Sequence, residues 1–427
     1  MRFRGKYRLT RLLLYFKTCF TPYKWSGGFV GLWLVNLLLR FLGWRKYRIF
    51  SMTDYVDKLR HRGDKLIRTT PERLIFCVQP RFDDKEEEKV IECRASSLYI
   101  AELHDVEAII GSNFVLTDRG EVVCDMLAGD VHDRIQFHNA WSDGNRMILL
   151  RPFEEISSDG PLYVDRGILW TGNYAFNYYH LTVEIMPRLQ KVDHYVPQEV
   201  PLIVDSQMVR FPQFRELIAL FNRSSRPIIE IGCEQRCRFG TLYYPALSSY
   251  IIPNIKCGKR SVLTDTLFDR SALEYVRQMV LAAKSDRQFA KRIFLYRNSA
   301  LRLFNQDEVF AALQPLGFEK IAVETLSLID QAALFYQAEI IVGGSGATFT
   351  NLLYCSPDSK AYILTNYRYD QIAVFSSLAS VAGMSLFYVP AHDCIFDKGS
   401  ETEAIHDDFD IDPQKVVEFV TRTVPIH

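Results

Sequence analysis

Residues 338–354 read AEIIVGGSGATFTNLLY, and this stretch decides the fold class of the chain. The apolar run 340–342 (IIV) is typical of a buried strand in a parallel sheet. Residues 343–346 (GGSG) then form a turn, and residues 347–354 are expected to be a helix. This order presents backbone N–H groups and the positive end of a helix dipole to an anion. The stretch predicts an anion site, with a ligand-free turn as the alternative because it matches neither a Walker loop nor G-x-G-x-x-G.

The second half of the chain alternates strand-like runs with helical segments. Strands are expected at 292–296, 320–323, 340–342, 361–364 and 386–389, and helices at 264–284, after Asn305, and at 328–337, 347–354 and 369–382. Asn305 and Glu308 have the spacing of a capping box, and Ser327 is an expected N-cap. Such alternation predicts a parallel, doubly wound α/β sheet with ligands beyond the carboxyl ends of its strands.

The first half is expected to be rich in strands up to about residue 175, and to alternate strands and helices after it. Strands are expected at 107–116, 121–124, 162–164, 168–170, 202–204, 228–231 and 242–244, and a helix at 212–221. The acidic run 83–89 (DDKEEEK) is expected to be a solvated turn, and 253–260 a linker.

Charge is distributed unevenly along the 427 residues. Residues 1–53 hold eleven Lys and Arg and no acid, while the rest holds 40 basic and 51 acidic residues, a net charge of about −11. An acidic body argues against nucleic acid as its main partner.

The basic N-terminal segment is expected to lie on a membrane surface. Residues 29–39 (FVGLWLVNLLL) are apolar, but Arg40 ends this run well short of the ~20 residues that span a bilayer. Basic flanks with Trp25, Trp33 and Trp44 suit an element resting on anionic lipid. We therefore expect peripheral attachment to the cytoplasmic, inner face of the plasma membrane, with packing against the protein itself as the alternative.

Nine scattered cysteines do not form a disulfide framework. Cys233 and Cys237 are spaced C-x3-C, but no second pair or His pair completes a zinc site. Free thiols in a reducing cytosol are therefore expected, without a bound metal.

His180 and Glu184 form the first candidate catalytic pair. They are four residues apart in NYAFNYYHLTVEIMPRLQ (173–190), so a helix would place them on one face until Pro187 bends or ends it. A His beside a carboxylate is a plausible general base, and a surface ion pair is the alternative.

Arg297 and Arg302 follow the expected strand 292–296 and form the second candidate cluster. The guanidinium fork matches phosphate oxygens, and fixed dipoles with Arg can stabilise a leaving diphosphate without a metal. Glu324, Gly344 and the glycine turn are expected at strand ends of the same crevice.

Three segments resemble glycosyltransferase family 61. They are NYYHLTVEIMPRL (177–189), RIFLYRNSALRLFNQDEVF (292–310) and VETLSLIDQAALFYQAEIIVGGSGATFTNLLY (323–354). They match, in order, the family patterns N-x-x-H-x-x-x-E/D-x-x-P, R-x-x-x-x-R-x-x-N-x-x-E, E-x-L-s-x-x-x-Q and G-x-x-G-A-x-x-T-N. The resemblance covers roughly residues 160–390.

The resemblance implies a GT-B architecture, in which two Rossmann-like domains face each other across a cleft. On this basis the chain divides into a membrane-associating segment (1–53), an acceptor domain (54–255), a donor domain (256–390) and an acidic tail with a C-terminal helix (391–427). The implied donor-site residues are Arg297, Arg302, Asn305, Ser345, Gly346, Ala347, Thr350 and Asn351. Many members have His at the position of Ser345 and a basic residue at that of Asn298, so here phosphate contacts would pass to backbone N–H groups and Arg.

The resemblance also implies inverting transfer of a sugar from a nucleotide sugar, commonly UDP-linked, with no metal or other cofactor. Glu184 is the expected base and His180 its partner or an acceptor contact, although the reverse is open. The acceptor is expected to be a glycan or lipid-linked oligosaccharide of a surface polysaccharide. A secretory-pathway enzyme, a nucleotide-sugar epimerase of similar fold and a non-catalytic membrane assembly subunit are the alternatives.

Overall fold

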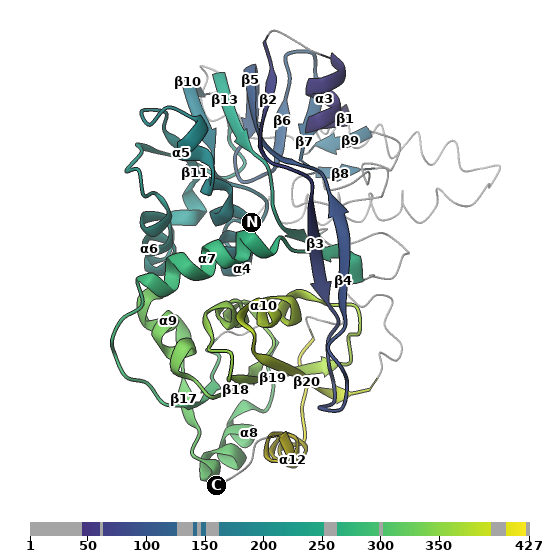
Figure 1. The fold of residues 1–427 in the computed structure, drawn as a ribbon, viewed down its shortest axis with the longest axis vertical. Coiled ribbons are helices and arrows are strands. Elements are labelled where there is room, and N and C mark those ends of the chain that lie inside the picture. The colour runs from purple at the N-terminus through teal and green to yellow at the C-terminus, as the bar shows by residue number, and fades with distance from the viewer. Residues whose placement is uncertain are drawn as a thin grey trace, which may run out of the picture.

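The computed structural model describes residues 45–59, 63–125, 140–142, 147–150, 162–251, 263–298, 302–393 and 407–423. Figure 1 shows two lobes, each built on its own sheet, with helix α7 (Arg270–Ala282) between them. Helix α7 contacts helices of both lobes, namely α6 (Pro212–Phe221) of the first and α9 (Leu328–Gln337) and α10 (Val374–Ala382) of the second.

The second lobe is the predicted parallel sheet. Its five strands lie in the order β17-β16-β18-β19-β20 and all run parallel. Their bounds are Glu319–Ile321 (β17), Arg292–Leu295 (β16), Ile340–Gly344 (β18), Lys360–Tyr367 (β19) and Ser385–His392 (β20). In chain order this is 2-1-3-4-5, so the strand order reverses between β16 and β18. Ligands of doubly wound sheets bind at this switch point.

Helices cover both faces of this sheet. One face packs on α9, η8 (Ala347–Tyr354) and α10, and the other on α8 (Gln306–Leu313) and α12 (Pro413–Thr423). The cause is that successive side chains of a strand point to opposite faces of the sheet. In strand β18, Ile341 packs with α9, η8 and α10, and Val342 packs with α8 and α12.

Helix boundaries account for several errors of prediction. The segment 264–284 becomes helical at Arg270, because Asp269 accepts a hydrogen bond from the Ala272 N–H and caps it. Helix α10 starts at Val374 and not at residue 369. The predicted capping box is wrong, since Asn305 makes no side-chain cap bond to α8 and binds Glu308 and Ile411 instead. Ser327 caps α9 as predicted, through the Asp330 N–H.

The first lobe contains an 11-stranded mixed sheet in the order β12-β11-β10-β13-β5-β6-β7-β1-β9-β8, with β2 paired to β5. Strands β10 to β13 form a parallel part with the order 3-2-1-4, as in one half of a Rossmann fold. From β5 onward most pairs are antiparallel, so this lobe is larger and more mixed than predicted. The GT-B arrangement stays a prediction.

The bounds in the first lobe correct two predicted strands. The segment 107–116 is two strands joined by a turn in which Gly111 has φ +78°. The segments 162–164 and 168–169 belong to one strand, β10, which ends at Leu169. The strands are β1 (Arg45–Ser51), β2 (Lys65–Thr70), β3 (Arg73–Val78), β4 (Val90–Ala95), β5 (Leu98–Ile109), β6 (Phe114–Leu116), β7 (Glu121–Cys124), β8 (Ala140–Ser142), β9 (Met147–Leu150), β10 (Leu162–Leu169), β11 (Leu202–Asp205), β12 (Ile228–Ile231), β13 (Arg236–Pro245), β14 (Tyr250–Ile251) and β15 (Thr266–Leu267), with helices α3 (Met52–Leu59) and α5 (Val192–Tyr195).

The folded part of the chain begins before residue 54. Strand β1 pairs with β7 and β9, so residues 45–51 belong to the sheet of the first lobe. The predicted membrane segment therefore overlaps this lobe at its end, and its residues 1–44 lie outside the described ranges, as does the predicted linker 253–260. Among the described residues, no helix has the length and apolar character required to cross a bilayer.

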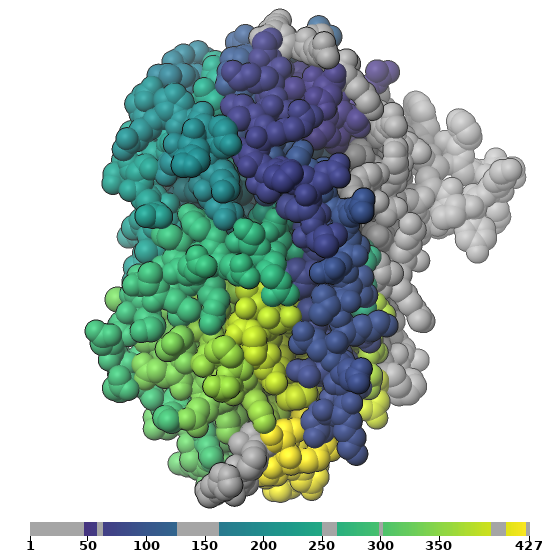
Figure 2. Space-filling view, viewed as in Figure 1, coloured from purple at the N-terminus to yellow at the C-terminus, as the bar shows by residue number. Residues whose placement is uncertain are grey.

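A hairpin of strands β3 and β4, here called the β3–β4 arm (residues 73–95), reaches from the first lobe onto the second (Figure 1). The Val78 N–H donates to Ser377 Oγ at 2.9 Å, and the Tyr388 N–H donates to the Arg81 carbonyl at 2.8 Å. In Figure 2 the arm is a strip of blue that runs from the first lobe to the yellow C-terminal residues.

The tip of the arm is the solvent-exposed turn that its acidic sequence predicts, and its carboxylates also meet cations of the second lobe. Asp84 and Asp83 lie 2.9 and 3.3 Å from Arg422 of α12, and Glu86 lies 3.6 Å from Arg368. The acidic run thus docks on cations of the second lobe. Each exposed pair contributes little, about 0–1 kcal/mol, so the backbone bonds at Val78 and Arg81 carry more of the attachment.

Within the described ranges, the cysteines agree with the prediction of free thiols. Six of them have free thiols, and no disulfide joins any two of these six.

Candidate active site

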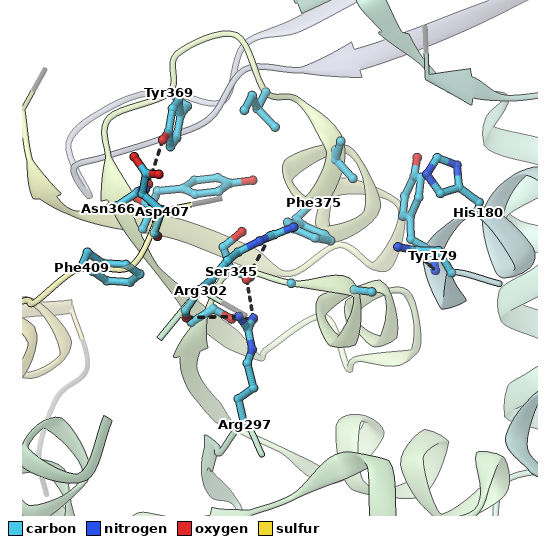
Figure 3. Close-up of a pocket in the computed structure, with 18 residues that line it drawn as sticks. Tyr179, His180, Arg297, Arg302, Ser345, Asn366, Tyr369, Phe375, Asp407 and Phe409 are labelled. Carbon is cyan, nitrogen blue, oxygen red and sulfur yellow. Dashed lines mark hydrogen bonds between the residues drawn. The ribbon is translucent and has the colours of Figure 1, made fainter. Parts of the chain in front are cut away.

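A cavity of about 180 Å³ lies between the two lobes (Figure 3). The first lobe contributes the segment around His180, and the second contributes the ends of β16, β18 and β19 together with part of the C-terminal tail. The lining residues are Asn177, Tyr179, His180, Arg297, Arg302, Gly344, Ser345, Gly346, Ala347, Thr365, Asn366, Tyr369, Ile372, Val374, Phe375, Tyr388, Asp407 and Phe409. The cavity therefore sits at the switch point of the parallel sheet.

His180 lies at a change of helix type. The short helix α4 (Tyr178–His180) is followed by a π-helix, η2 (Leu181–Ile185), and then by the 3₁₀ helix η3 (Met186–Leu189). Pro187 sits in the first turn of η3, so helical turns continue past it to Leu189, whereas the α-helical turn already ends at His180. Single π-helical turns inside helices are frequent at functional sites, because they shift side chains out of the α-helical register.

His180 and Glu184 form a closely packed pair. His180 Nδ1 lies 2.9 Å from Glu184 Oε1, and the two side chains are 18% and 7% exposed. The alternative of an ordinary surface ion pair is therefore excluded. His180 lines the cavity while Glu184 lies behind it, so Nε2 is the ring nitrogen left to meet a ligand.

Aromatic rings fix the orientation of the imidazole. The rings of Tyr174 and Tyr179 have centroids 5.2 and 5.1 Å from that of His180. Tyr174 adopts φ +59°, a left-handed conformation that is unfavourable for a residue with a Cβ. Such backbone strain persists where the surrounding structure imposes it, and it is concentrated at functional sites.

The glycine turn faces His180 from the second lobe. Strand β18 ends at Gly344, the Ser345 N–H donates to the Leu364 carbonyl at 2.9 Å, and η8 starts at Ala347. The first N–H groups of a helix have no partner inside it, so they can bind an anion. A Cβ on Gly346 would collide with Arg297 Nη2, which explains why this position has no side chain.

Arg297 and Arg302 place two cations against this turn. Arg297 Nη2 donates to the Gly344 carbonyl at 3.2 Å, and Arg302 Nη1 lies 3.5 Å from the Ser345 carbonyl. Burial lowers the pKa of both guanidinium groups, and Arg302 lowers the pKa of Arg297 further. Two desolvated, mutually repelling cations favour the binding of an anion between them.

The sequence matches the family model of Glycosyltransferase 61 over residues 178–362. Residues 178–362 are a glycosyltransferase 61 domain. This domain spans both walls of the cavity, from His180 to the glycine turn. A comparison with curated protein sequences gave no match.

Most of the predicted residues of the glycosyltransferase 61 domain meet at the cavity. His180, Arg297, Arg302, Gly344, Ser345, Gly346 and Ala347 all line it. Glu184 does not line the cavity but bonds to His180, which does. Arg302 adopts φ +55° and is held next to the tail, since the Leu303 N–H donates to Asp408 Oδ1 at 2.7 Å.

Four predicted donor residues do not line this cavity. Asn305 bonds the backbone of Ile411, and Glu324 is exposed and accepts from Asn298 Nδ2 at 2.7 Å. Thr350 and Asn351 are fully buried within η8. These four residues therefore lie outside the lining of the cavity.

Asn351 connects the two lobes. Tyr178 Oη donates to Asn351 Oδ1 at 2.7 Å, and Asn351 Nδ2 donates to Gln331 Oε1 at 3.0 Å. Burial raises the pKa of Tyr178 to about 12, so its phenol stays protonated and remains a donor at neutral pH. This chain of bonds fixes His180, two residues along, relative to the glycine turn.

Tyr178→Phe should lower the free energy of unfolding by about 1–3 kcal/mol, because Asn351 Oδ1 is then buried without its donor. Urea denaturation measures the loss. Tyr195→Phe is the matched control, since Tyr195 is 42% exposed, and it should change the midpoint little. Equal midpoints for all three proteins would contradict the structural role of this bond.

Sequence reasoning missed the cavity residues that lie beyond the glycosyltransferase 61 domain, among them Asn366, Tyr369, Phe375, Tyr388, Asp407 and Phe409. The strand-end rule could have found Asn366, since it lies near the carboxyl end of β19. No local pattern marks Asp407, which the tail brings back to the sheet. Among the described residues, no group of three or more His, Cys, Asp or Glu could hold a metal ion.

Proposed function

We propose that this protein is an inverting glycosyltransferase that moves a sugar from a nucleotide sugar, most simply UDP-linked, to a glycan hydroxyl. One observation carries the proposal: a single cavity has a partly buried arginine pair and a glycine turn on one wall and the His180–Glu184 pair on the other. In the GT-B terms of the resemblance, the second lobe holds the donor and the first receives the acceptor.

The diphosphate of the donor binds at the end of β18 in this proposal. Arg297 and Arg302 contribute positive charge, and the N–H groups at the start of η8 contribute fixed dipoles. These groups stabilise the negative charge that grows on the leaving diphosphate. Neither a metal ion nor another cofactor is needed for this part of the reaction.

The acceptor is activated from the opposite wall. A base takes the proton of the acceptor hydroxyl while its oxygen attacks the anomeric carbon and the bond to the diphosphate oxygen breaks. The sequence favours Glu184 as this base, whereas the placement of His180 on the cavity wall favours His180. We therefore assign the proton transfer to His180 Nε2, with Glu184 orienting the ring through Nδ1.

The test is release of nucleotide from a panel of nucleotide sugars, with and without a polysaccharide acceptor. Acceptor-dependent release supports a transferase, and the anomeric configuration of the product, read by NMR, tests inversion. Conversion of the sugar without acceptor would indicate an epimerase. If neither reaction occurs and no nucleotide binds, the protein is a non-catalytic assembly subunit.

The sequence alone supports the proposed acceptor and location. A basic, apolar N-terminal segment suits attachment to anionic lipid on the cytoplasmic face, where lipid-linked precursors of a capsule or O-antigen are extended.

Deletion of residues 1–44 should move the protein from the membrane fraction to the supernatant and leave nucleotide binding intact. The deletion stops at residue 44 because β1 starts at Arg45 and pairs with β7 and β9. Sedimentation with anionic vesicles measures attachment, and high salt should weaken it by screening. A truncated protein that still sediments with the vesicles would refute membrane attachment through this segment.

A further inference from the structure

We propose that the tail segment 407–411 completes the donor site, and that Asp407 binds the ribose hydroxyls of the nucleotide. The inference rests on the proposed function and names the part of the donor that this end of the cavity binds. Asp407, Asn366 and Tyr369 lie outside the glycosyltransferase 61 domain, so the family match does not account for them.

The tail segment is fixed to the loop that carries Arg302. The Phe409 N–H donates to the Leu303 carbonyl at 3.0 Å. Asn305 donates to the Ile411 carbonyl and accepts from the Ile411 N–H, both at 3.0 Å. The rings of Phe304 and Phe409 stack with centroids 5.3 Å apart and planes 6° from parallel. These contacts hold the segment in place, and its residues Asp407 and Phe409 line the cavity.

Asp407 belongs to a polar group at one end of the cavity. Tyr369 Oη donates to Asn366 Oδ1 at 2.8 Å, and Asn366 Nδ2 lies 3.4 Å from the Asp407 carbonyl, which holds the backbone of Asp407 beside β19. Figure 3 shows Asn366, Tyr369 and Asp407 together on one side of the arginines, with His180 on the other side.

This arrangement indicates which part of the donor meets Asp407. In a nucleotide sugar the diphosphate separates the transferred sugar from the nucleoside. If the arginines hold the diphosphate and His180 marks the reacting sugar, the nucleoside extends toward Asp407. A carboxylate can accept hydrogen bonds from two neighbouring hydroxyls, and ribose presents such a pair. An acidic side chain serves ribose hydroxyls in the same way at the switch point of dinucleotide-binding folds.

The carboxylate also has a cost that makes the inference testable. A negative charge near the diphosphate opposes its binding, and hydrogen bonds from ribose hydroxyls would offset this repulsion. Removing Asp407 should therefore lower the affinity for ribonucleotides, whereas the affinity for inorganic pyrophosphate should stay the same or increase.

The experiment measures dissociation constants by calorimetry for the wild type, Asp407→Ala and Asp410→Ala. Asp410 is an exposed neighbour in the same segment and serves as the matched control. The ligands are the tightest-binding of UDP, GDP, CDP and ADP, its 2′-deoxy and 3′-deoxy analogues, and pyrophosphate. We expect the wild type and Asp410→Ala to prefer the ribonucleotide over at least one deoxy analogue by roughly 10-fold or more.

In Asp407→Ala this preference should fall below about threefold, whereas pyrophosphate affinity should not decrease. An unchanged preference in Asp407→Ala, or equal weakening of ribonucleotide and pyrophosphate, would overturn the ribose assignment while leaving the donor site standing. A wild type that binds neither nucleotide nor pyrophosphate would overturn the donor site itself.

Discussion

His180→Ala should lower turnover by roughly 10²–10⁴-fold, the usual range for loss of a general base, while nucleotide affinity stays near that of the wild type. The reason is the division of the cavity: His180 comes from the first lobe, and the arginines and the glycine turn come from the second. Initial rates with saturating acceptor and direct nucleotide titration measure the two effects separately.

Glu184→Gln decides between the two candidate bases. The amide oxygen can still accept from His180 Nδ1, so a Glu184 that only orients the ring should give a smaller loss than His180→Ala. A larger loss for Glu184→Gln would restore the carboxylate as base, as the sequence suggested. His194→Ala is the control, since His194 is an exposed His of the same lobe. Full turnover in His180→Ala and Glu184→Gln would remove the pair from the mechanism.

Arg297→Ala should weaken nucleoside diphosphate binding by about 1.5–3 kcal/mol, or roughly 10- to 150-fold in Kd, because a charge-assisted contact is lost. Turnover with the donor below saturation should fall in parallel. The surface variant Arg287→Ala removes an arginine that is 60% exposed and should leave Kd unchanged.

Gly346→Ala gives an independent test of the same site. The backbone of Gly346 is extended (φ 175°), so any residue can adopt it without strain. The new methyl group would displace the Arg297 guanidinium, and nucleotide affinity should fall as in Arg297→Ala. If Gly346→Ala and Arg297→Ala both bind nucleotide normally, the diphosphate lies elsewhere.

The parallel sheet of the second lobe was predictable because its strands are continuous apolar runs and its helices carry local signals. Residues 340–342 and the cap at Ser327 illustrate the two kinds of signal, and both lie where the sequence predicts them. The approach of His180 to the glycine turn was predictable only through the resemblance. No periodicity within either segment indicates that they share a cavity.

The features that could not be predicted depend on contacts between distant segments. Asn351 was expected to contact the donor, yet its side chain is buried and bonds Tyr178 from the other lobe. Asp407 reaches the cavity because the tail returns along Leu303 and Asn305. The ion pairs that the exposed acidic run 83–89 makes with Arg368 and Arg422 could not be predicted, because these partners are remote in sequence.

The β3–β4 arm restricts how the cavity can open. A motion that pulled the lobes straight apart would break the Val78–Ser377 and Arg81–Tyr388 bonds, and Tyr388 itself lines the cavity. The arm acts together with the Tyr178–Asn351 hydrogen bond, which also joins the two lobes. Separation of the lobes around the cavity therefore costs hydrogen bonds at both places.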